Sequence, residues 1–183
     1  MKNERREAKR NKIKWTGKEC AYLAVFVALL IAAQLCFAFL PGVEIVTALF
    51  IAYAFTFGVK RGVLAAVAFS LLRQLVFGFF PTVLILYLAY YPLLALLFGF
   101  LGGCVKNPVY ALWWLTALAC VCTVCFTMLD NIITPLWYAY TKEAARAYFL
   151  ASLSIMLSQV GCTAATVAFL FLPLERAFRL VKF

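Results

Sequence analysis

The sequence predicts an all-α integral membrane protein, a six-transmembrane-helix bundle with both termini in the cytoplasm. Three observations lead to this fold class. The 183-residue chain is 67% hydrophobic and only 13% charged, whereas a soluble domain carries about 25% charged residues. Its charges leave several apolar stretches of the ~20 residues that a helix needs to cross a bilayer. These stretches lack the alternation of polar and apolar residues that is typical of strands in a membrane barrel.

The first three helices are predicted from the turn residues that separate the apolar stretches. Pro and Gly mark their ends because both are unfavourable inside helices. We assign the first stretch to the mature protein, because it is longer than the ~7–15-residue core of a cleaved signal peptide. The three helices cover residues 18–40, 43–59 and 63–77, with Pro41-Gly42, Lys60-Arg61-Gly62 and Gly78 at their ends.

The last three helices follow the same reasoning, with Lys106-Asn107-Pro108 predicted as a turn. The longest predicted connection covers residues 131–141 and is rich in aromatic side chains, which favour the water–lipid interface. This connection is either an interfacial belt or a lid over a pocket. The predicted helices cover residues 82–104, 109–130 and 143–172, with a kink expected at Pro92.

The distribution of positive charge predicts the orientation and three parts of the chain. Fourteen of the seventeen Lys and Arg residues fall in the N-terminal leader with the adjoining Lys18, in two connections and in the C-terminal tail, all on one side. Cytoplasmic segments retain positive charge, so this side is the cytoplasm. We interpret the net charge of +10 as topology and attraction to anionic lipid. The parts are a basic leader (1–17), a membrane domain (18–172) and a basic tail (173–183).

Several kinds of chemistry are excluded by the residues that the sequence lacks. There is no histidine, and no phosphate-binding loop of the kind that hydrolyses ATP. Cys122 and Cys125 have the spacing of a redox pair, but with no acid beside them we interpret them as small apolar side chains. The sequence therefore predicts a protein that is not an enzyme and has no cofactor or metal site.

Three ionisable residues are predicted to lie in the outer half of the bilayer. Glu44 begins the second helix, Arg73 lies within the third, and Asp130 ends the fifth. Ionisable groups at this depth are costly and are candidates for function. They either line a ligand site or form an Arg73–Asp130 or Arg73–Glu44 ion pair that only holds helices together.

Polar side chains on the last three helices are spaced so that each set shares one helix face. Thr116, Thr123, Thr127 and Asp130 lie on one face of the fifth helix. These faces either line a polar cavity or merely hydrogen-bond across helices and to backbone carbonyls. A matching face of the sixth helix carries Ser152, Gln159, Thr163 and Thr166. The predicted ligand-binding residues are Glu44, Arg73, Tyr87, Tyr91, Thr127, Asp130, Asn131, Trp137 and Gln159.

Ala24, Ala28 and Ala32 recur every four residues along the first helix. Small residues at this spacing let another helix approach closely. The stripe either packs inside the protein or docks a partner protein.

Residues 41–103 resemble the substrate-binding membrane subunits, or S components, of energy-coupling factor (ECF) transporters, which are bacterial vitamin importers. The resemblance depends on the PGVE-x-VT opening of the second helix, the FG-x-KRG turn, the LLR-x-x-x-FG end of the third helix and the Gly-rich end of the fourth. One departure is Phe79-Phe80-Pro81-Thr82, where many relatives have a Gly-Pro-Trp-Thr-Pro-like stretch. The floor of the pocket is therefore expected to differ.

The resemblance implies a multi-pass protein of the bacterial cell membrane that binds a vitamin or related micronutrient from outside. It implies docking through Ala24, Ala28 and Ala32 to a transmembrane coupling subunit with two ATPase subunits. It also implies that the subunit topples in the membrane to release its ligand inside. The alternatives are a self-sufficient secondary transporter, a small membrane enzyme and a scaffold subunit without a ligand.

Overall fold

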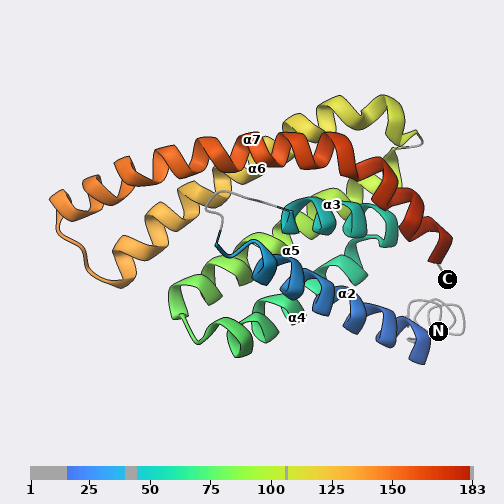
Figure 1. Cartoon of the computed structure of the whole chain (residues 1–183), viewed down its shortest axis with the longest axis horizontal. Helices are drawn as coiled ribbons and strands as arrows, with labels where there is room; N and C mark the ends of the chain where they lie inside the picture. Colours follow the sequence, from blue (N-terminus) through green and yellow to red (C-terminus); the bar gives the residue numbers. More distant parts are fainter. Residues whose placement is uncertain (1–15, 40–44, 106, 182–183) are drawn as a thin grey trace, which may run out of the picture.

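The computed structural model describes residues 16–39, 45–105 and 107–181, which form α-helices without any strand (Figure 1). The predicted all-α class and six-helix count are confirmed. Four helices, α2, α5, α6 and α7, are long and apolar enough to cross a membrane. The helices are α2 (Gly17–Cys36), α3 (Val46–Phe57), α4 (Val59–Phe77), α5 (Pro81–Cys104), α6 (Pro108–Trp137) and α7 (Lys142–Val181).

Two helix starts are fixed by local side chains. The Thr16 hydroxyl accepts the Glu19 N–H, and the Glu19 carboxylate accepts the Thr16 N–H, which is a capping box at the start of α2. Asn107 caps α6 by accepting the Val109 N–H, with Pro108 in the first turn. Proline suits that position because its missing N–H has no partner there in any helix.

The short helix α3 is the centre of the bundle. All of its residues are buried, and α5 and α7 pack on it. Close approach of α5 depends on Gly102, because a Cβ atom there would lie 1.9 Å from the Phe55 carbonyl oxygen. The core therefore needs small residues where backbones meet, as is common between membrane helices.

The outer surface carries large apolar side chains. Leu75, Phe100, Trp113, Leu157 and Phe169 are each more than 60% exposed, and they come from four helices. A soluble protein rarely shows so much apolar surface. This surface suits lipid, and together with the apolar helices it indicates a membrane-embedded protein.

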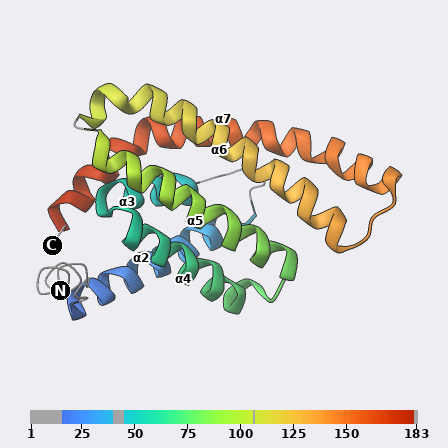
Figure 2. The same cartoon turned by 180° about the vertical axis from the view of Figure 1, so that it is seen from behind.

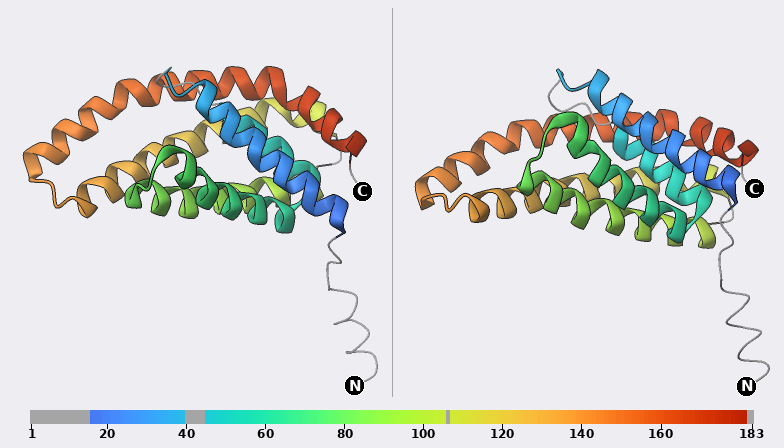
Figure 3. Two further views of the ribbon diagram at one scale, coloured as in Figure 1. Left: turned by 60° about the horizontal axis from the view of Figure 1, so that its bottom comes forward. Right: turned by 90° about the horizontal axis from the view of Figure 1, so that it is seen from below.

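The start of α2 and the end of α7 lie at the same end of the bundle (Figures 1 and 2). Their contact is direct, because the Phe178 ring packs against Phe26 with ring centroids 5.8 Å apart. The α6–α7 hairpin projects beyond the other helices at the opposite end (Figure 1). Figure 3 shows α2 on the outside of the bundle, running obliquely across it.

The predicted turn at Lys60-Arg61-Gly62 is wrong. These residues belong to α4, and the chain turns at Gly58 with φ 82°. A positive φ favours glycine, so Gly58 is the better break. Gly62 instead lies inside the helix, where its missing side chain leaves room for Ala54 and Ala95.

The last two helices are longer than predicted. Helix α6 continues through residues 131–137, so the connection to α7 is only residues 138–141. Helix α7 continues past Pro173 to Val181 and contains most of the segment assigned to the tail. An internal proline costs about 3 kcal/mol. Burial of the Phe178 ring against Phe26 and Tyr53 of the core beyond it helps to offset this cost.

Candidate functional site

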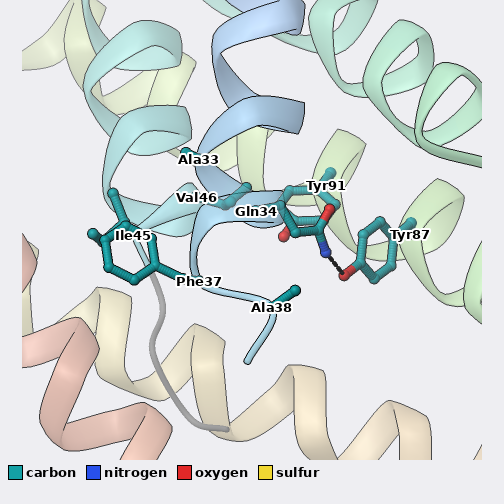
Figure 4. Close-up of a pocket in the computed structure, with 8 residues that line it drawn as sticks. All are labelled: Ala33, Gln34, Phe37, Ala38, Ile45, Val46, Tyr87 and Tyr91. Carbon is teal, nitrogen blue, oxygen red and sulfur yellow. Dashed lines mark hydrogen bonds between the residues drawn. The ribbon is translucent and has the colours of Figure 1, made fainter. Parts of the chain in front are cut away.

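A cavity of about 140 Å³ lies where the end of α2 meets the start of α3 and the first half of α5. We call it the Gln34 cavity. Figure 4 shows the Gln34 amide pointing at the Tyr87 hydroxyl, to which it is hydrogen-bonded. It lies at the end of the bundle opposite the start of α2 and the end of α7. The lining residues are Ala33, Gln34, Phe37, Ala38, Ile45, Val46, Tyr87 and Tyr91.

Gln34 connects this cavity to Arg73. Arg73 Nε donates to Gln34 Oε1 at 3.0 Å, and Gln34 Nε2 donates to the Tyr87 hydroxyl at 2.8 Å. The guanidinium also lies over the Tyr87 and Phe77 rings, 4.7 Å from each centroid, in cation–π geometry. Arg73 Nη1 is buried without a hydrogen-bond partner among the described residues. A donor therefore remains available beside the cavity.

A second cavity, of about 150 Å³, lies between the C-terminal half of α6 and the start of α7. We call it the Asp130 cavity. Like the first, it lies at the end opposite the start of α2 and the end of α7. Its lining residues are Phe126, Thr127, Asp130, Tyr148, Ala151, Ser152, Ile155 and Gln159.

Two hydroxyls hold the Asp130 carboxylate in place. Tyr148 donates to Oδ2 at 2.6 Å, and Thr134 donates to Oδ1 at 2.8 Å. At the next residue of α6, Asn131 Nδ2 donates to the Ser152 hydroxyl at 2.8 Å. Both helices therefore contribute to one hydrogen-bonded cluster around the carboxylate.

The two cavities share an aromatic wall. Tyr87 lines the Gln34 cavity and Phe126 lines the Asp130 cavity, and their ring centroids are 5.9 Å apart. Tyr90 also packs against Phe126, with ring centroids 4.8 Å apart. A positive and a negative side chain thus lie near neighbouring cavities.

The predicted polar faces of α6 and α7 meet each other. The Thr123 and Thr163 hydroxyls are 3.0 Å apart, and Thr127 donates to Gln159 Oε1 at 3.2 Å. Thr116 instead donates to the Leu112 carbonyl of its own helix. The polar faces therefore do both of the things that the sequence allowed. Thr116, Thr123 and Thr163 only form hydrogen bonds between helices or to backbone carbonyls, whereas Thr127 and Gln159 also line the Asp130 cavity.

The Arg73–Asp130 ion pair, one of the alternatives to a ligand site, is not formed. Within the described residues, the ion pairs are Glu19–Arg61 and Glu175–Arg179. Arg73 is held by Gln34 and aromatic rings, and Asp130 is held by hydroxyls. The alternative Arg73–Glu44 pair lies outside the described residues.

Most of the predicted ligand-binding residues gather around these two cavities. Tyr87 and Tyr91 line the Gln34 cavity, and Arg73 is hydrogen-bonded to Gln34 of its lining. The Asp130 cavity is lined by Thr127, Asp130 and Gln159, and Asn131 is hydrogen-bonded to Ser152 of its lining. Trp137 is the exception: it lies exposed at the end of α6 and lines neither cavity. Glu44 falls outside the described residues.

The alanine stripe faces outward. Ala24, Ala28 and Ala32 are all exposed on α2. Ala24 also lines a shallow apolar groove between α2 and α4, with Leu23, Val27, Leu64, Ala68, Leu72 and Cys20.

Sequence reasoning missed Gln34, Tyr148 and Phe126. Gln34 had a usable signal, because it is the only amide in the apolar stretch of α2. Tyr148 lies four residues before Ser152, one turn along the polar face already identified on α7. Phe126 had no signal, since an apolar side chain in an apolar helix is not distinctive.

Comparison with protein-family models, curated proteins and solved structures gives no match to this chain.

Proposed function

We propose that this chain is the substrate-capturing membrane subunit of an ECF-type importer in a bacterial cell membrane. In this role it binds a vitamin or related micronutrient from outside and delivers it inward with a separate ATPase module. The orientation assumed is the one predicted from the positive charges, which places both cavities on the outer side.

One observation carries this proposal. Arg73 and Asp130 lie beside neighbouring cavities of an apolar bundle, and neither has an ion-pair partner among the described residues. Charged groups at membrane depth are costly when unpaired. A bound polar molecule would compensate both groups, so ligand capture explains their presence better than helix packing does.

Coupling to a partner is the second half of the proposal. The exposed Ala24, Ala28 and Ala32 leave a smooth face on α2 where a helix of the coupling subunit can approach. The sequence has no ATP-hydrolysing motif, so energy for uphill import would come from the ATPase subunits of that module.

The first experiment is mass spectrometry of small molecules that co-purify with the protein in mild detergent, after the cells are fed a vitamin mixture. A single vitamin-sized molecule is expected from the wild type and is expected to be lost from an Asp130→Asn, Arg73→Gln double variant. Glu143→Gln is the control, because Glu143 is exposed at the same end and lines neither cavity. Only phospholipid, or nothing, from the wild type would contradict ligand capture.

Docking is tested separately with Ala28→Leu, which adds bulk to the outward face of α2. Loss of co-purification with the coupling subunit is expected, with ligand binding retained. Ala165→Leu makes the same change on the exposed side of α7 and should leave the complex intact. A normal complex in Ala28→Leu would show that the coupling subunit does not dock on this face.

A further inference from the structure

The hydroxyl protons around the Asp130 cavity are already committed. Tyr148 and Thr134 donate to Asp130, and Thr127 donates to Gln159 Oε1. Ser152 donates to the Phe149 carbonyl at 2.8 Å. A hydroxyl has one proton to give, so none of these groups has a second to offer a ligand.

Acceptor capacity, in contrast, is left over. An ionised carboxylate offers about four lone-pair sites, and the bonds from Tyr148 and Thr134 use only two of those on Asp130. Asn131 Oδ1 is buried without a hydrogen-bond partner among the described residues. Amide N–H groups of Gln159 are the main donors that remain. The cluster is therefore short of donors, and a group that binds there must donate.

The charge of the Asp130 carboxylate also favours a ligand that donates hydrogen bonds. No described Lys or Arg forms an ion pair with Asp130. Arg73 is engaged on the far side of the Tyr87–Phe126 wall, and Arg146 and Lys142 are exposed at the start of α7. A negative charge with no cationic partner at this depth favours a cationic ligand group.

The rest of the cavity wall is apolar. Phe126, Ala151 and Ile155 complete its lining. Phe126 and Tyr148 contribute aromatic rings, and the face of such a ring attracts an ammonium group. A hydrated metal ion gains little from such a wall, whereas an organic cation places its hydrocarbon part against it.

We propose that the Asp130 cavity binds the ammonium group of an organic amine, with the apolar part of that amine packed against Phe126. This inference rests on the proposed function and narrows its ligand to a molecule that carries a protonated amine or an equivalent multi-donor cation. Asp130 is the charge partner, and Asn131 Oδ1 is the second acceptor.

The test measures the binding of three simple probes to the detergent-purified wild-type protein at neutral pH by isothermal titration calorimetry. Benzylamine, benzyl alcohol and benzoate share a ring and differ in charge. Benzylamine is expected to bind at least about tenfold more tightly than benzyl alcohol, since charge-assisted hydrogen bonds are the stronger ones. Equal binding of benzyl alcohol, or preferred binding of benzoate, would overturn the inference.

Variants then assign the preference to Asp130. Asp130→Asn is expected to abolish it, whereas Glu143→Gln removes an exposed acid at the same end and should leave it unchanged. Where Asp130→Asn fails to fold, Asp130→Ser gives the same test, because it also removes the carboxylate and keeps a polar side chain; it too is expected to abolish the preference. Retention of the preference in either variant, once folded, would contradict the assignment.

Two further results separate this inference from the proposed function. Asp130-dependent binding of sodium without any benzylamine preference would show an inorganic cation site and overturn the amine assignment. A co-purified ligand that is neutral or anionic would agree with the proposed capture role but would contradict the binding of an amine in the Asp130 cavity. Benzylamine binding needs no coupling module, so failure to assemble with one would leave the inference intact.

Discussion

Gln34 is the residue that ties three helices together at the Arg73 side chain. Its amide accepts from Arg73 on α4 and donates to Tyr87 on α5, while its own backbone belongs to α2. Only a side chain with both an acceptor and a donor can make this bridge. The bridge fixes the guanidinium beside the cavity, so Gln34 is a positioning residue for any anionic ligand group.

Gln34→Leu is expected to destabilise the protein by about 1–3 kcal/mol, because it leaves the partly buried Arg73 Nε unpaired. Thermal unfolding in detergent, followed by circular dichroism, measures the loss. Adding Arg73→Met should recover part of it, since removing both partners leaves no unpaired donor. Strictly additive losses in the double variant would show that the bridge contributes nothing to stability.

At the scale of helices, close packing depends on where a glycine lies. Gly102 and Gly103 are neighbours near the end of α5, but only Gly102 faces α3. A Cβ atom at Gly102 would meet the Phe55 backbone, whereas one at Gly103 would meet nothing within 4 Å. Backbone cannot move aside as a flexible side chain can, so the two positions should respond differently to the same substitution.

Gly102→Ala is expected to cost about 1–3 kcal/mol or to prevent folding, because overpacking forces α3 and α5 apart. Gly103→Ala is the matched control and should be neutral or slightly stabilising, since alanine favours helix more than glycine does. Unfolding temperatures of both variants in one detergent give the comparison. Equal stability of the two would contradict the packing of α5 on α3.

The sequence predicted helix faces better than helix ends. The spacing of Thr123 and Thr127 on α6 and of Gln159 and Thr163 on α7 identified two faces that do meet, because helical periodicity fixes which residues share a face. Helix ends depend on tertiary packing. The turn falls at Gly58, and α7 passes Pro173, because core contacts beyond each point decide the outcome.

The site was predictable only in part for a related reason. Asp130 and Arg73 stood out because charges are rare in apolar helices. The sequence did not indicate that Arg73 and Asp130 would be separated by the Tyr87–Phe126 wall. Which helices become neighbours is a property of the whole bundle, so one cavity was expected and two adjoining cavities were found.

For the whole molecule, basic residues from separate segments gather at one end. Arg61 of α4 pairs with Glu19 at the start of α2, and the end of α7, with Arg176 and Arg179, lies at the same end. An even number of membrane crossings requires both termini on one side. Because cytoplasmic ends retain Lys and Arg, this end is predicted to face the cytoplasm and both cavities the outside.

Thiol labelling of whole cells tests this orientation. In a cysteine-free background, one variant restores Cys104 at the end of α5, and another carries Thr141→Cys in the α6–α7 connection; both positions are exposed. A membrane-impermeant maleimide is expected to label only the second in intact cells and both after permeabilisation. Labelling of Cys104 alone would show the inverse orientation, with both cavities facing the cytoplasm. That result would contradict capture from outside. Labelling of both in intact cells would contradict a bilayer between the two ends, because these positions lie at opposite ends of the helices that are long enough to cross it.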